Sequence, residues 1–483
     1  MKHAYRHRPR LVGPLGLILL TMLAPMSIAE AATPPNIVLI MADDLGWKDL
    51  HCYGNPALDT PVLDRLAAEG VRLTNGYAAA PVCTPTRAAI MTGQSPARLQ
   101  ITNHAPGNGQ GFHLPGSTLC EAEWQSFLPL SADTLAERLR GAGYATGFLG
   151  KWHLSHRVGR DERGGYEPRL RPEHQGFQLN VGGCQFGGPP SYFAPYKLPN
   201  LEPRSEMEYL PDRLAEEGIA FVREHQEKPF FLCWWNYSVH YPFQAPQELI
   251  EKYQQRASGN GTPQAGNENP VYSAMIEGMD RAIGRLLAEL DRLGLADNTL
   301  VVFTSDNGPF AANVKPLRGE KGYLYEGGIR VPWIVRWPGV VRPGTEAADL
   351  VVSTDLFPTF LAAAGVESPR DQPIDGVNLL PMLRGDESLV ERTLVFHYPN
   401  YAFHKQNRLG SALRQGSLKL IQFYDDRSIE LYDLTSDISE TNDLAKAMPE
   451  RAAALQEALQ QSLAAMDARL PTRLADDQAH DDQ

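Results

Sequence analysis

Cysteine is scarce in this sequence. The 483 residues include only five, namely Cys52, Cys83, Cys120, Cys184 and Cys233. None stands in a C-x-x-C pair, which argues against a zinc site of the usual spacing. Five is odd, so at least one thiol lacks an intramolecular disulfide partner. Cys120 and Cys184 lie in loop-like, Gly-rich stretches and form a candidate pair, whereas Cys233 sits in an apolar run typical of a buried free cysteine.

Positive charge is also in short supply. Lys and Arg number 45 against 57 Asp and Glu, which gives a formal net charge of -12. The chain has no basic tail and no Lys/Arg stripe, so nucleic acid is not an expected partner. At 43% hydrophobic and 21% charged residues, the composition is that of a soluble globular protein. An acidic protein repels anions at long range, so any site for a sulfate or phosphate ester needs local positive charge.

The N-terminal segment is typical of an export signal. Basic residues precede an apolar stretch from Leu11 to Met26, and Ala29-Glu30-Ala31 matches a small-residue cleavage site. We expect cleavage after Ala31 and export to the periplasm or the exterior. The alternative is an uncleaved membrane anchor, for which the apolar stretch is short. We therefore expect no stable membrane anchor.

Apolar runs that end abruptly in polar residues recur along the chain. They cover residues 36–41, 144–149, 230–235, 299–304 and 331–335. Such near-continuous β-rich runs are typical of buried strands in a mostly parallel sheet. Amphipathic segments lie between them, at residues 61–69, 132–142, 211–226 and 272–293. Strands that alternate with helices indicate an α/β fold with helices on both faces of the sheet.

The pattern changes from about Thr393. Short strands are predicted at residues 393–398, 417–423 and 429–432, followed by a helix at 449–466. This order predicts a smaller α+β subdomain with an antiparallel sheet. The expected organisation is a signal peptide at 1–31, a catalytic domain at 32–390, a C-terminal subdomain at 391–470 and a disordered tail at 471–483.

Polar residues follow several of the predicted strands. They are Asp43, Asp44, Lys151, His153, His240, Asp306 and Asn307. Ligands of open α/β sheets bind beyond the carboxyl ends of the strands. Asp and Asn oxygens suit Ca²⁺ or Mg²⁺, while Lys and His suit an anion and proton transfer. Any one of these residues could equally be a helix cap or a surface charge. Their joint occurrence at strand ends is what predicts a site.

Cys83 has a distinctive local setting. Thr84 can cap a helix, Pro85 suits its first turn, and residues 87–91 continue it. A cysteine at that position faces backbone N–H groups and the positive end of the helix dipole. This setting lowers the pKa of a thiol and attracts an anion. A thiol nucleophile and an inert loop cysteine both remain compatible with the local pattern.

A longer match resolves this choice. The segment from Cys83 to Gly93 resembles the type I sulfatase signature, C-x-P-x-R followed by T-G. Further matching segments are 36–46, Gly150-Lys151-Trp152-His153, Ser305–Gly308, Leu317–Gly322 and Glu326–Pro332. The resemblance, to the arylsulfatase and N-acetylgalactosamine-6-sulfatase group, runs from about Pro35 to Leu444. It implies an alkaline-phosphatase-like α/β sandwich with a large mixed, mostly parallel sheet.

The resemblance also implies a modified residue and a metal. In this family a separate maturation enzyme converts the signature cysteine, here Cys83, to formylglycine. The aldehyde is hydrated to a gem-diol, one hydroxyl attacks sulfur, and the second lets the sulfated intermediate collapse. The metal is expected to be Ca²⁺, with Mg²⁺ as the alternative. Its ligands would be Asp43, Asp44, modified Cys83, Asp306 and Asn307.

The remaining roles are carried over on the same motifs. Arg87 would hold the hydrated aldehyde, and Lys151 would bind the nucleophile and the sulfate. His153 would take the proton that lets the intermediate collapse. His240 and Lys321 would contact the sulfate and the bridging oxygen, with His240 as the acid for the leaving alcohol. Weaker candidates for substrate contact are His104, in a long loop, and His397 and His404, in the C-terminal part.

The expected activity is hydrolysis of sulfate esters. The expected substrate is a sulfated carbohydrate, with a simple aryl sulfate as a surrogate. One alternative is a phosphodiesterase or phosphonate monoester hydrolase of the same superfamily, some of which share the cysteine motif. The other is a catalytically inactive glycan-binding relative, although every expected catalytic position is filled here.

Overall fold

The structure is a computed structural model that describes residues 1–4, 34–108, 111–155, 167–259, 269–310, 312, 314–402 and 407–474. Residues 34–483 group into one compact unit, whose fold is described below. Nearly all of the expected signal peptide, His404 and most of the expected tail lie outside the described residues. Among the residues that are described, no helix combines the length and apolar character needed to cross a bilayer.

A mixed sheet of eight strands forms the centre of the molecule, in the order β5-β4-β6-β1-β7-β8-β2-β9. The strands are β1 (Asn36–Ala42), β2 (Val71–Tyr77), β4 (Ala145–Gly150), β5 (Leu179–Val181), β6 (Phe230–Trp235), β7 (Thr299–Ser305), β8 (Trp333–Arg336) and β9 (Thr345–Val352). β8 runs antiparallel to both neighbours, and every other pair is parallel. The predicted mixed, mostly parallel sheet is confirmed.

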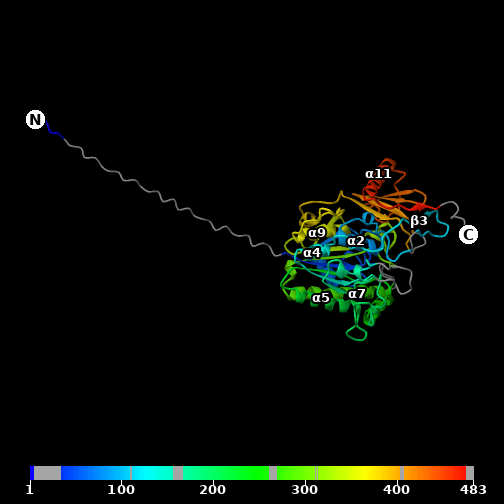
Figure 1. Cartoon of the computed structure of the whole chain (residues 1–483), viewed down its shortest axis with the longest axis horizontal. Helices are drawn as coiled ribbons and strands as arrows, with labels where there is room; N and C mark the ends of the chain where they lie inside the picture. Colours follow the sequence, from blue (N-terminus) through cyan, green and yellow to red (C-terminus); the bar gives the residue numbers. More distant parts are fainter. Residues whose placement is uncertain are drawn as a thin grey trace. The chain divides into compact units, whose positions relative to one another are not determined.

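Helices cover both faces of this sheet, with α5 and α7 on one side and α2, α4 and α9 on the other (Figure 1). The first layer contains α1 (Pro61–Ala68), α5 (Leu210–Glu224), α6 (Gln247–Gly259) and α7 (Pro270–Arg292). The second contains α2 (Cys83–Thr92), α3 (Pro96–Leu99), α4 (Leu135–Gly141), α9 (Leu356–Ala363) and α10 (Leu380–Arg384). Alternate residues of β1 serve the two cores: Val38 and Ile40 face one, while Ile37 and Leu39 face the other.

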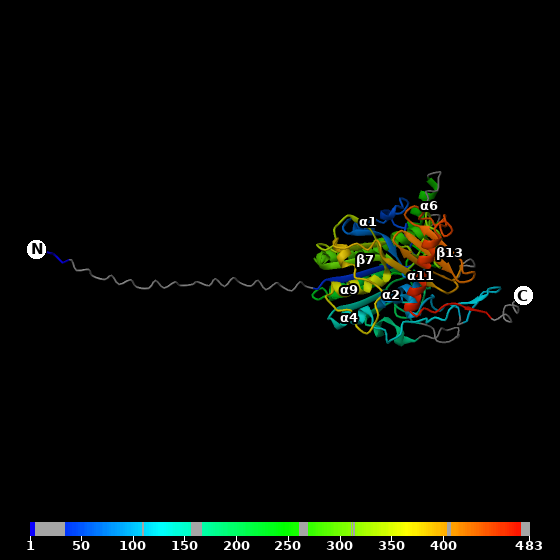
Figure 2. The same cartoon turned by 90° about the horizontal axis from the view of Figure 1, so that it is seen from above.

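A second sheet is antiparallel and has four strands, β10 (Thr393–Tyr398), β11 (Gly410–Gln415), β12 (Leu418–Phe423) and β13 (Ile429–Asp433). The helix α11 (Pro449–Ala465) covers one face through an apolar cluster that includes Leu420 and Leu459 (Figure 2). The other face packs on the main body, where Phe396 and Ile421 share a cluster with Tyr77. Two short strands, β3 (Leu119–Cys120) and β14 (Thr472–Arg473), pair separately.

Two expectations at the level of the fold need correction. Cys120 and Cys184 do not form a disulfide, and all five cysteines are free. Cys184 is buried, and its Sγ lies 3.7 Å from the Tyr237 hydroxyl. The strands β2, β3, β5, β9, β11 and β14 were not predicted. In β2 half-buried Arg72 and Thr74 alternate with buried Val71 and Leu73, so this strand lacks the continuous apolar run of a central strand.

A buried ionic cluster joins the two sheets. The Lys419 Nζ atom, on β12, lies 2.9 Å from Glu326 Oε1 and 2.8 Å from Glu440 Oε1. Glu326 begins the short helix α8 (Glu326–Ile329), and it also accepts a hydrogen bond of 2.8 Å from the Tyr77 hydroxyl on β2. All three charged side chains are fully buried. Lys419 therefore bridges the two buried carboxylates, and Arg330 also pairs with Glu326, at 3.1 Å.

Replacing Lys419 tests this dependence. We expect K419M to lower the free energy of unfolding by about 3 kcal/mol, because it removes the ion pair of buried Glu440 and one of the ion pairs of Glu326. Urea unfolding followed by fluorescence measures the loss. The matched control is K446M, which removes an exposed lysine and should change stability by less than about 0.5 kcal/mol. Equal effects of the two substitutions would contradict the assignment.

Candidate active site

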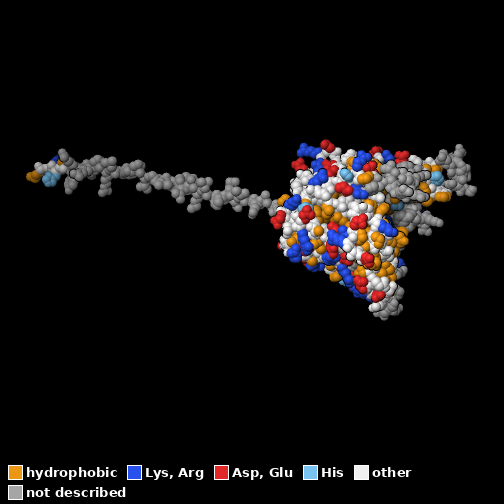
Figure 3. Space-filling view, turned by 60° about the horizontal axis from the view of Figure 1, so that its bottom comes forward, with side chains coloured by type: hydrophobic (Ala, Val, Ile, Leu, Met, Phe, Trp, Pro, Cys, Tyr) orange, Lys and Arg blue, Asp and Glu red, His pale blue; other side chains and the backbone are white. Residues whose placement is uncertain are grey.

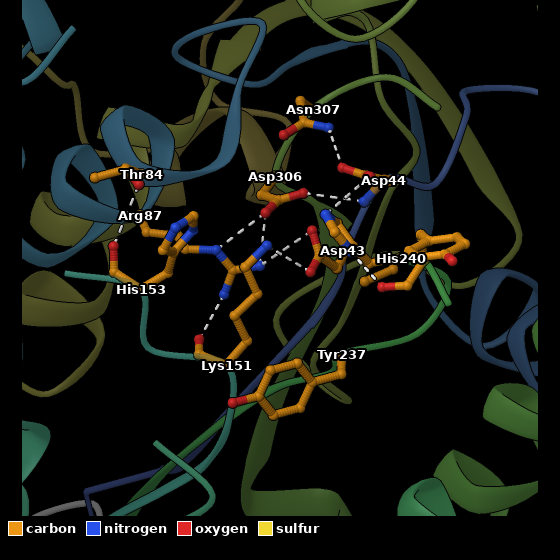
Figure 4. A network of polar contacts seen from close by, with 12 residues as sticks. Asp43, Asp44, Thr84, Arg87, Lys151, His153, Tyr237, His240, Asp306 and Asn307 are labelled. Carbon is orange, nitrogen blue, oxygen red and sulfur yellow. Dashed lines mark hydrogen bonds and ion pairs between the residues drawn. The ribbon is translucent and has the colours of Figure 1, made fainter. Parts of the chain in front are cut away.

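Four strands deliver polar side chains to one edge of the main sheet. β1 runs into Asp43 and Asp44, β7 into Asp306 and Asn307, and β4 into Lys151. β6, which leads toward His240, lies between β4 and β1. These four strands are parallel, so their carboxyl ends share one edge. The structure thus brings together the residues that the sequence places after separate strands (Figure 4).

Each buried carboxylate at this edge faces a buried cation. Lys151 Nζ lies 2.6 Å from Asp43 Oδ2, and Lys321 Nζ lies 2.6 Å from Asp44 Oδ1. The Arg87 guanidinium contacts Asp306 Oδ2 through Nε at 3.0 Å and Nη2 at 2.6 Å. On the face shown in Figure 3, basic and acidic side chains are interspersed. Arg87, Lys151 and Lys321 are buried and can supply positive charge to an anion at the site.

Burial and neighbouring charges shift the carboxyl pKa values in opposite directions. Burial raises the pKa of Asp43 well above its usual range, and the charge of Asp306 adds to that rise. Burial acts the same way on Asp44 and Asp306. At these two residues, however, the neighbouring cations outweigh burial. Lys321 lowers the pKa of Asp44, and Arg87 lowers that of Asp306. At Asp43, burial and the neighbouring carboxylates thus outweigh Lys151 and Arg87.

The same edge offers oxygen ligands for a metal ion. Ligand atoms of Asp43, Asp44 and Cys83 all lie within 4.8 Å of one another. Two further observations fit a cation: Asp43 Oδ1 and Asn307 Oδ1 are buried without a hydrogen-bond partner. Asp306 is beside them, since its Oδ1 accepts a hydrogen bond of 3.2 Å from the Asp44 N–H. This oxygen-rich set suits Ca²⁺ or Mg²⁺.

Cys83 is the first residue of α2, and the predicted cap is wrong. Val82 occupies the N-cap position without a side-chain bond. The Thr84 hydroxyl instead accepts a hydrogen bond from the Ala105 N–H at 3.0 Å and donates one to the His153 carbonyl at 3.2 Å. Thr84 therefore ties the helix to the segments that carry Ala105 and His153.

The predicted activation of the Cys83 thiol is also wrong. Cys83 is buried, and that burial raises its pKa. Asp306 and Asp43 raise it further, against the lowering effect of Lys151 and Lys321. Desolvation thus outweighs the helix N-terminus and both lysines. An unmodified Cys83 would be a protonated thiol at neutral pH, which is a poor nucleophile.

Arg87 lies one helical turn after Cys83 and is fully buried. Besides Asp306, its guanidinium donates to the Lys151 carbonyl through Nη1 at 2.6 Å. The Trp235 ring packs beneath it, with the guanidinium carbon 5.1 Å from the ring centroid. Arg87 is thereby fixed by α2, β4 and β6 at once.

Two imidazoles line the site in opposite tautomers. His153 Nε2 lies 2.5 Å from the Ala105 carbonyl oxygen. A carbonyl only accepts, so Nε2 carries the hydrogen, and the buried Nδ1, which has no hydrogen-bond partner, carries a lone pair. His240 is reversed, because its Nδ1 lies 2.7 Å from the Tyr241 carbonyl oxygen. The His240 Nε2 atom faces Asp44 Oδ2 at 3.7 Å.

Both imidazoles are neutral at pH 7 in this arrangement. Burial lowers the pKa of His240 to about 3, helped by the charge of Lys321. Burial and Lys151 hold the pKa of His153 well below its usual value. His153 Nδ1 is thus a base ready to accept a proton, whereas His240 needs added negative charge nearby before it can donate one.

Two of the site residues have left-handed backbone conformations that non-glycine residues rarely adopt. Asp44 has φ 61° and His153 has φ 56°. Hydrogen bonds fix both: the Tyr272 hydroxyl donates to the Asp44 carbonyl at 3.2 Å, and the His153 N–H donates to the Cys184 carbonyl at 3.0 Å. Contacts with the surrounding structure therefore offset the backbone strain at Asp44 and His153.

A cavity of about 400 Å³ opens over these groups. Its lining consists of Cys83, His104, Ala105, Pro106, His153, Gly187, Gly188, His240, Tyr241, Phe310 and Lys321. His104, an expected substrate contact, is among them. Ala105, Pro106, Gly187, Gly188, Tyr241 and Phe310 were not among the predicted site residues. The run Gly187-Gly188-Pro189-Pro190 was the available signal for part of this lining.

His397, another expected substrate contact, is not among the residues that line this cavity. His397 is buried within the C-terminal sheet region, where Nδ1 contacts Ser411 Oγ at 2.7 Å and Nε2 contacts the Arg469 carbonyl at 2.9 Å. Both ring nitrogens are thus engaged, which fits a structural histidine. His404 lies outside the described residues.

Comparison with known proteins gives concordant results. The sulfatase family model matches residues 35–366, and the model for the C-terminal region of N-sulphoglucosamine sulphohydrolase matches residues 319–469. Human arylsulfatase A is 36% identical over 416 residues, which cover 80% of this chain and 74% of that protein. Pig N-acetylgalactosamine-6-sulfatase is 34% identical over 417 residues, covering 80% and 72%.

A solved structure extends the similarity to the fold. The crystal structure of Ps i-CgsB in complex with k-i-k-neocarrahexaose matches with a TM-score of 0.75 and 28% identity, and it covers 89% of this chain and 93% of that one. Taken with the family model and the relatives, this match leads to one conclusion. The chain belongs to the sulfatase family and is a sulfuric ester hydrolase.

Proposed function

We propose that this enzyme desulfates carbohydrates with a formylglycine derived from Cys83. The observation that carries the proposal is the Cys83 environment. Three buried cations and an oxygen-rich ligand set surround a side chain whose thiol is held protonated by burial. Hydrated formylglycine would supply two hydroxyls, one to attack sulfur and one to release the bound sulfate. The aldehyde would come from a separate maturation enzyme acting on the Cys83 signature.

The metal in this proposal is Ca²⁺, and Mg²⁺ is the alternative that the experiment below distinguishes. Asp43, Asp44, Asp306 and Asn307 would hold it together with the modified Cys83. Bound there, the ion would offset the negative charge of the sulfate oxygens. The Oδ1 atoms of Asp43 and Asn307, buried without a hydrogen-bond partner, support this assignment.

The cations have complementary tasks. Lys151 pairs with Asp43 and Lys321 with Asp44, and both lysines would contact sulfate oxygens. Lys321 lines the cavity beside His240, where the bridging oxygen of the ester would lie. Arg87, held by three elements, would orient the nucleophile and offset its developing charge.

The two histidines divide the proton transfers. His240 would protonate the leaving alcohol through Nε2, since Nδ1 is committed to the Tyr241 carbonyl. The charge of a bound sulfate ester favours protonation of His240, against the effect of burial. His153 would accept, on its bare Nδ1, the proton whose removal lets the sulfated intermediate collapse. One residue thus acts in each half of the reaction.

The substrate proposal rests on the relatives and on the cavity. Two relatives are named arylsulfatase A and N-acetylgalactosamine-6-sulfatase, and one structural neighbour is in complex with k-i-k-neocarrahexaose. The cavity lining includes Pro106, Tyr241 and Phe310, surfaces on which a sugar or aryl ring could pack while its sulfate lies near Cys83 and Lys321. His104 would contact a substituent next to the ester.

We further propose that residues 1–31 direct export and that residues 32–390 and 391–470 act as catalytic domain and subdomain.

Substituting Cys83 gives the most direct test. We expect C83A to reduce hydrolysis of 4-nitrophenyl sulfate by at least about 10³-fold without loss of folding, because the nucleophile is removed. Mass spectrometry of the peptide across Cys83 should find the aldehyde in active wild-type protein. C52A, which removes a half-buried thiol outside the site, is the control and should retain activity. An active enzyme in which every Cys83 is an unmodified thiol would contradict the proposal.

Metal removal tests the ligand set. Chelation should abolish activity, Ca²⁺ should restore it, and Ca²⁺ should raise Tm because it binds only the folded state. N307A should weaken Ca²⁺ binding by about 10- to 100-fold, measured by the Ca²⁺ dependence of Tm. D371N, which alters an exposed carboxylate, is the control. Restoration by Mg²⁺ and not Ca²⁺ would correct the metal, and a metal-independent Tm would contradict the site.

The phosphate-ester alternative is separated by matched substrates. Purified enzyme should hydrolyse 4-nitrophenyl sulfate and 6-sulfated N-acetylgalactosamine with a higher kcat/KM than the corresponding phosphate monoester or diester. The bridging-oxygen contacts are common to both classes, so the ratio of kcat/KM values decides between them. A preference for the phosphate diester would overturn the proposed substrate class.

A further inference from the structure

Gly187 and Gly188 form a strip of backbone against both imidazoles. A Cβ atom built on Gly187 would lie 2.8 Å from Cε1 and 2.9 Å from Nε2 of His153. A Cβ atom on Gly188 would lie 2.7 Å from Nδ1 of His240 and 2.8 Å from the Tyr241 carbonyl oxygen. Separations below 3.0 Å are closer than real Cβ contacts, so any side chain at either position must displace something.

The backbone conformation does not explain these two glycines. Neither has a φ in the left-handed range, unlike Gly182 in the same loop, which has φ 80°. An alanine at either position could therefore adopt the local backbone. What excludes a side chain is the space taken by the histidines.

The strip lies beside the two hydrogen bonds that set the tautomers. Gly187 abuts the Nε2 edge of His153, the edge that donates to the Ala105 carbonyl. Gly188 abuts Nδ1 of His240 and the Tyr241 carbonyl that accepts from it. A methyl group at either position would intrude on one of these bonds.

The loop that carries the strip is itself anchored. The Tyr237 hydroxyl, just beyond β6, donates to the Gly182 carbonyl at 2.9 Å. The Cys184 carbonyl in turn accepts from the His153 N–H at 3.0 Å. The loop thus holds His153 by its backbone at one point and confines its imidazole at another. These two contacts restrain the segment that leads into the glycine strip.

We propose that Gly187 and Gly188 are positioning residues, which confine His153 and His240 to the tautomers and orientations that proton transfer requires. This inference rests on the proposed function, because it assumes the roles given to the two imidazoles. It predicts different defects at adjacent positions: Gly188 should matter for leaving-group protonation and Gly187 for release of the bound sulfate.

The leaving group reports on Gly188. G188A should lower kcat/KM for a sugar sulfate, whose alcohol must be protonated, by about 10²-fold. On 4-nitrophenyl sulfate, whose phenolate leaves without a proton, the loss should stay below about 10-fold. The control is G141A: Gly141 has no atom within 4 Å of an added Cβ and no left-handed φ. Equal losses of G188A on both substrates would overturn the role given to Gly188.

Burst kinetics report on Gly187. In G187A alcohol release should proceed in a burst of one equivalent per site, followed by slow turnover, because collapse of the sulfated enzyme becomes limiting. The value of kcat should fall together with KM, which a general loss of folded protein would not produce. Turnover without a burst and with unchanged KM would overturn the role given to Gly187.

A double variant separates this inference from the proposed function. If Gly187 acts only through the imidazole of His153, G187A should have lower activity than wild type. The double variant G187A/H153A should then be as active as H153A alone. Should G187A fail to fold, folding of G187A/H153A would support the inference, and failure of both would overturn it. If H153A itself retains full activity, the proposed role of His153 fails. If H153A is impaired and G187A costs the same in either background, only the present inference fails.

Discussion

The constraint on which this structure depends is the burial of three carboxylates at one edge of the sheet. Isolated buried carboxylates would be protonated or would destabilise the fold, because desolvation of a charge costs several kcal/mol. Here Asp43, Asp44 and Asp306 are each paired with Lys151, Lys321 or Arg87. The six residues come from five separate segments of the chain. The fold must therefore bring distant segments into register for the charges to balance.

The remaining architecture follows from that requirement. Parallel pairing of β4, β6, β1 and β7 places their carboxyl ends side by side, and α2 brings Arg87 to the same edge. The loops that close the site then adopt conformations they would otherwise avoid, as the left-handed backbones of Asp44 and His153 demonstrate. A second ionic cluster around Lys419 joins the C-terminal sheet to the main body, as the first organises the strand ends. Buried charge therefore determines both how the parts join and where chemistry is placed.

The central strands and the polar residues that follow them were predictable from the local sequence pattern. The strands β1, β4, β6 and β7 are continuous apolar runs followed by polar residues, and both features are visible without a structure. β2 and β9 were missed because their polar residues interrupt the apolar run, and their partners lie far along the chain. Gly187 and Gly188 carry no chemistry of their own, so only the three-dimensional proximity of His153 and His240 reveals their importance. The predicted disulfide and the predicted Thr84 cap were wrong for a related reason. Cys184 contacts Tyr237, and Thr84 accepts a hydrogen bond from Ala105, so both side chains make tertiary contacts that the local sequence does not reveal.

The Cys83 pKa illustrates how tertiary environment overrides local chemistry. A cysteine at a helix N-terminus beside two lysines should ionise readily, yet full burial and two carboxylates keep it protonated. An environment that suppresses a thiolate does not penalise a neutral group in the same way, because desolvation acts on charge. The proposed aldehyde hydrate is neutral and hydrogen-bonding, and it would enter this site without the cost that the thiolate faces. The surroundings that make Cys83 inert as a thiol are thus compatible with its oxidised form, and a cysteine is needed here as the precursor of the nucleophile.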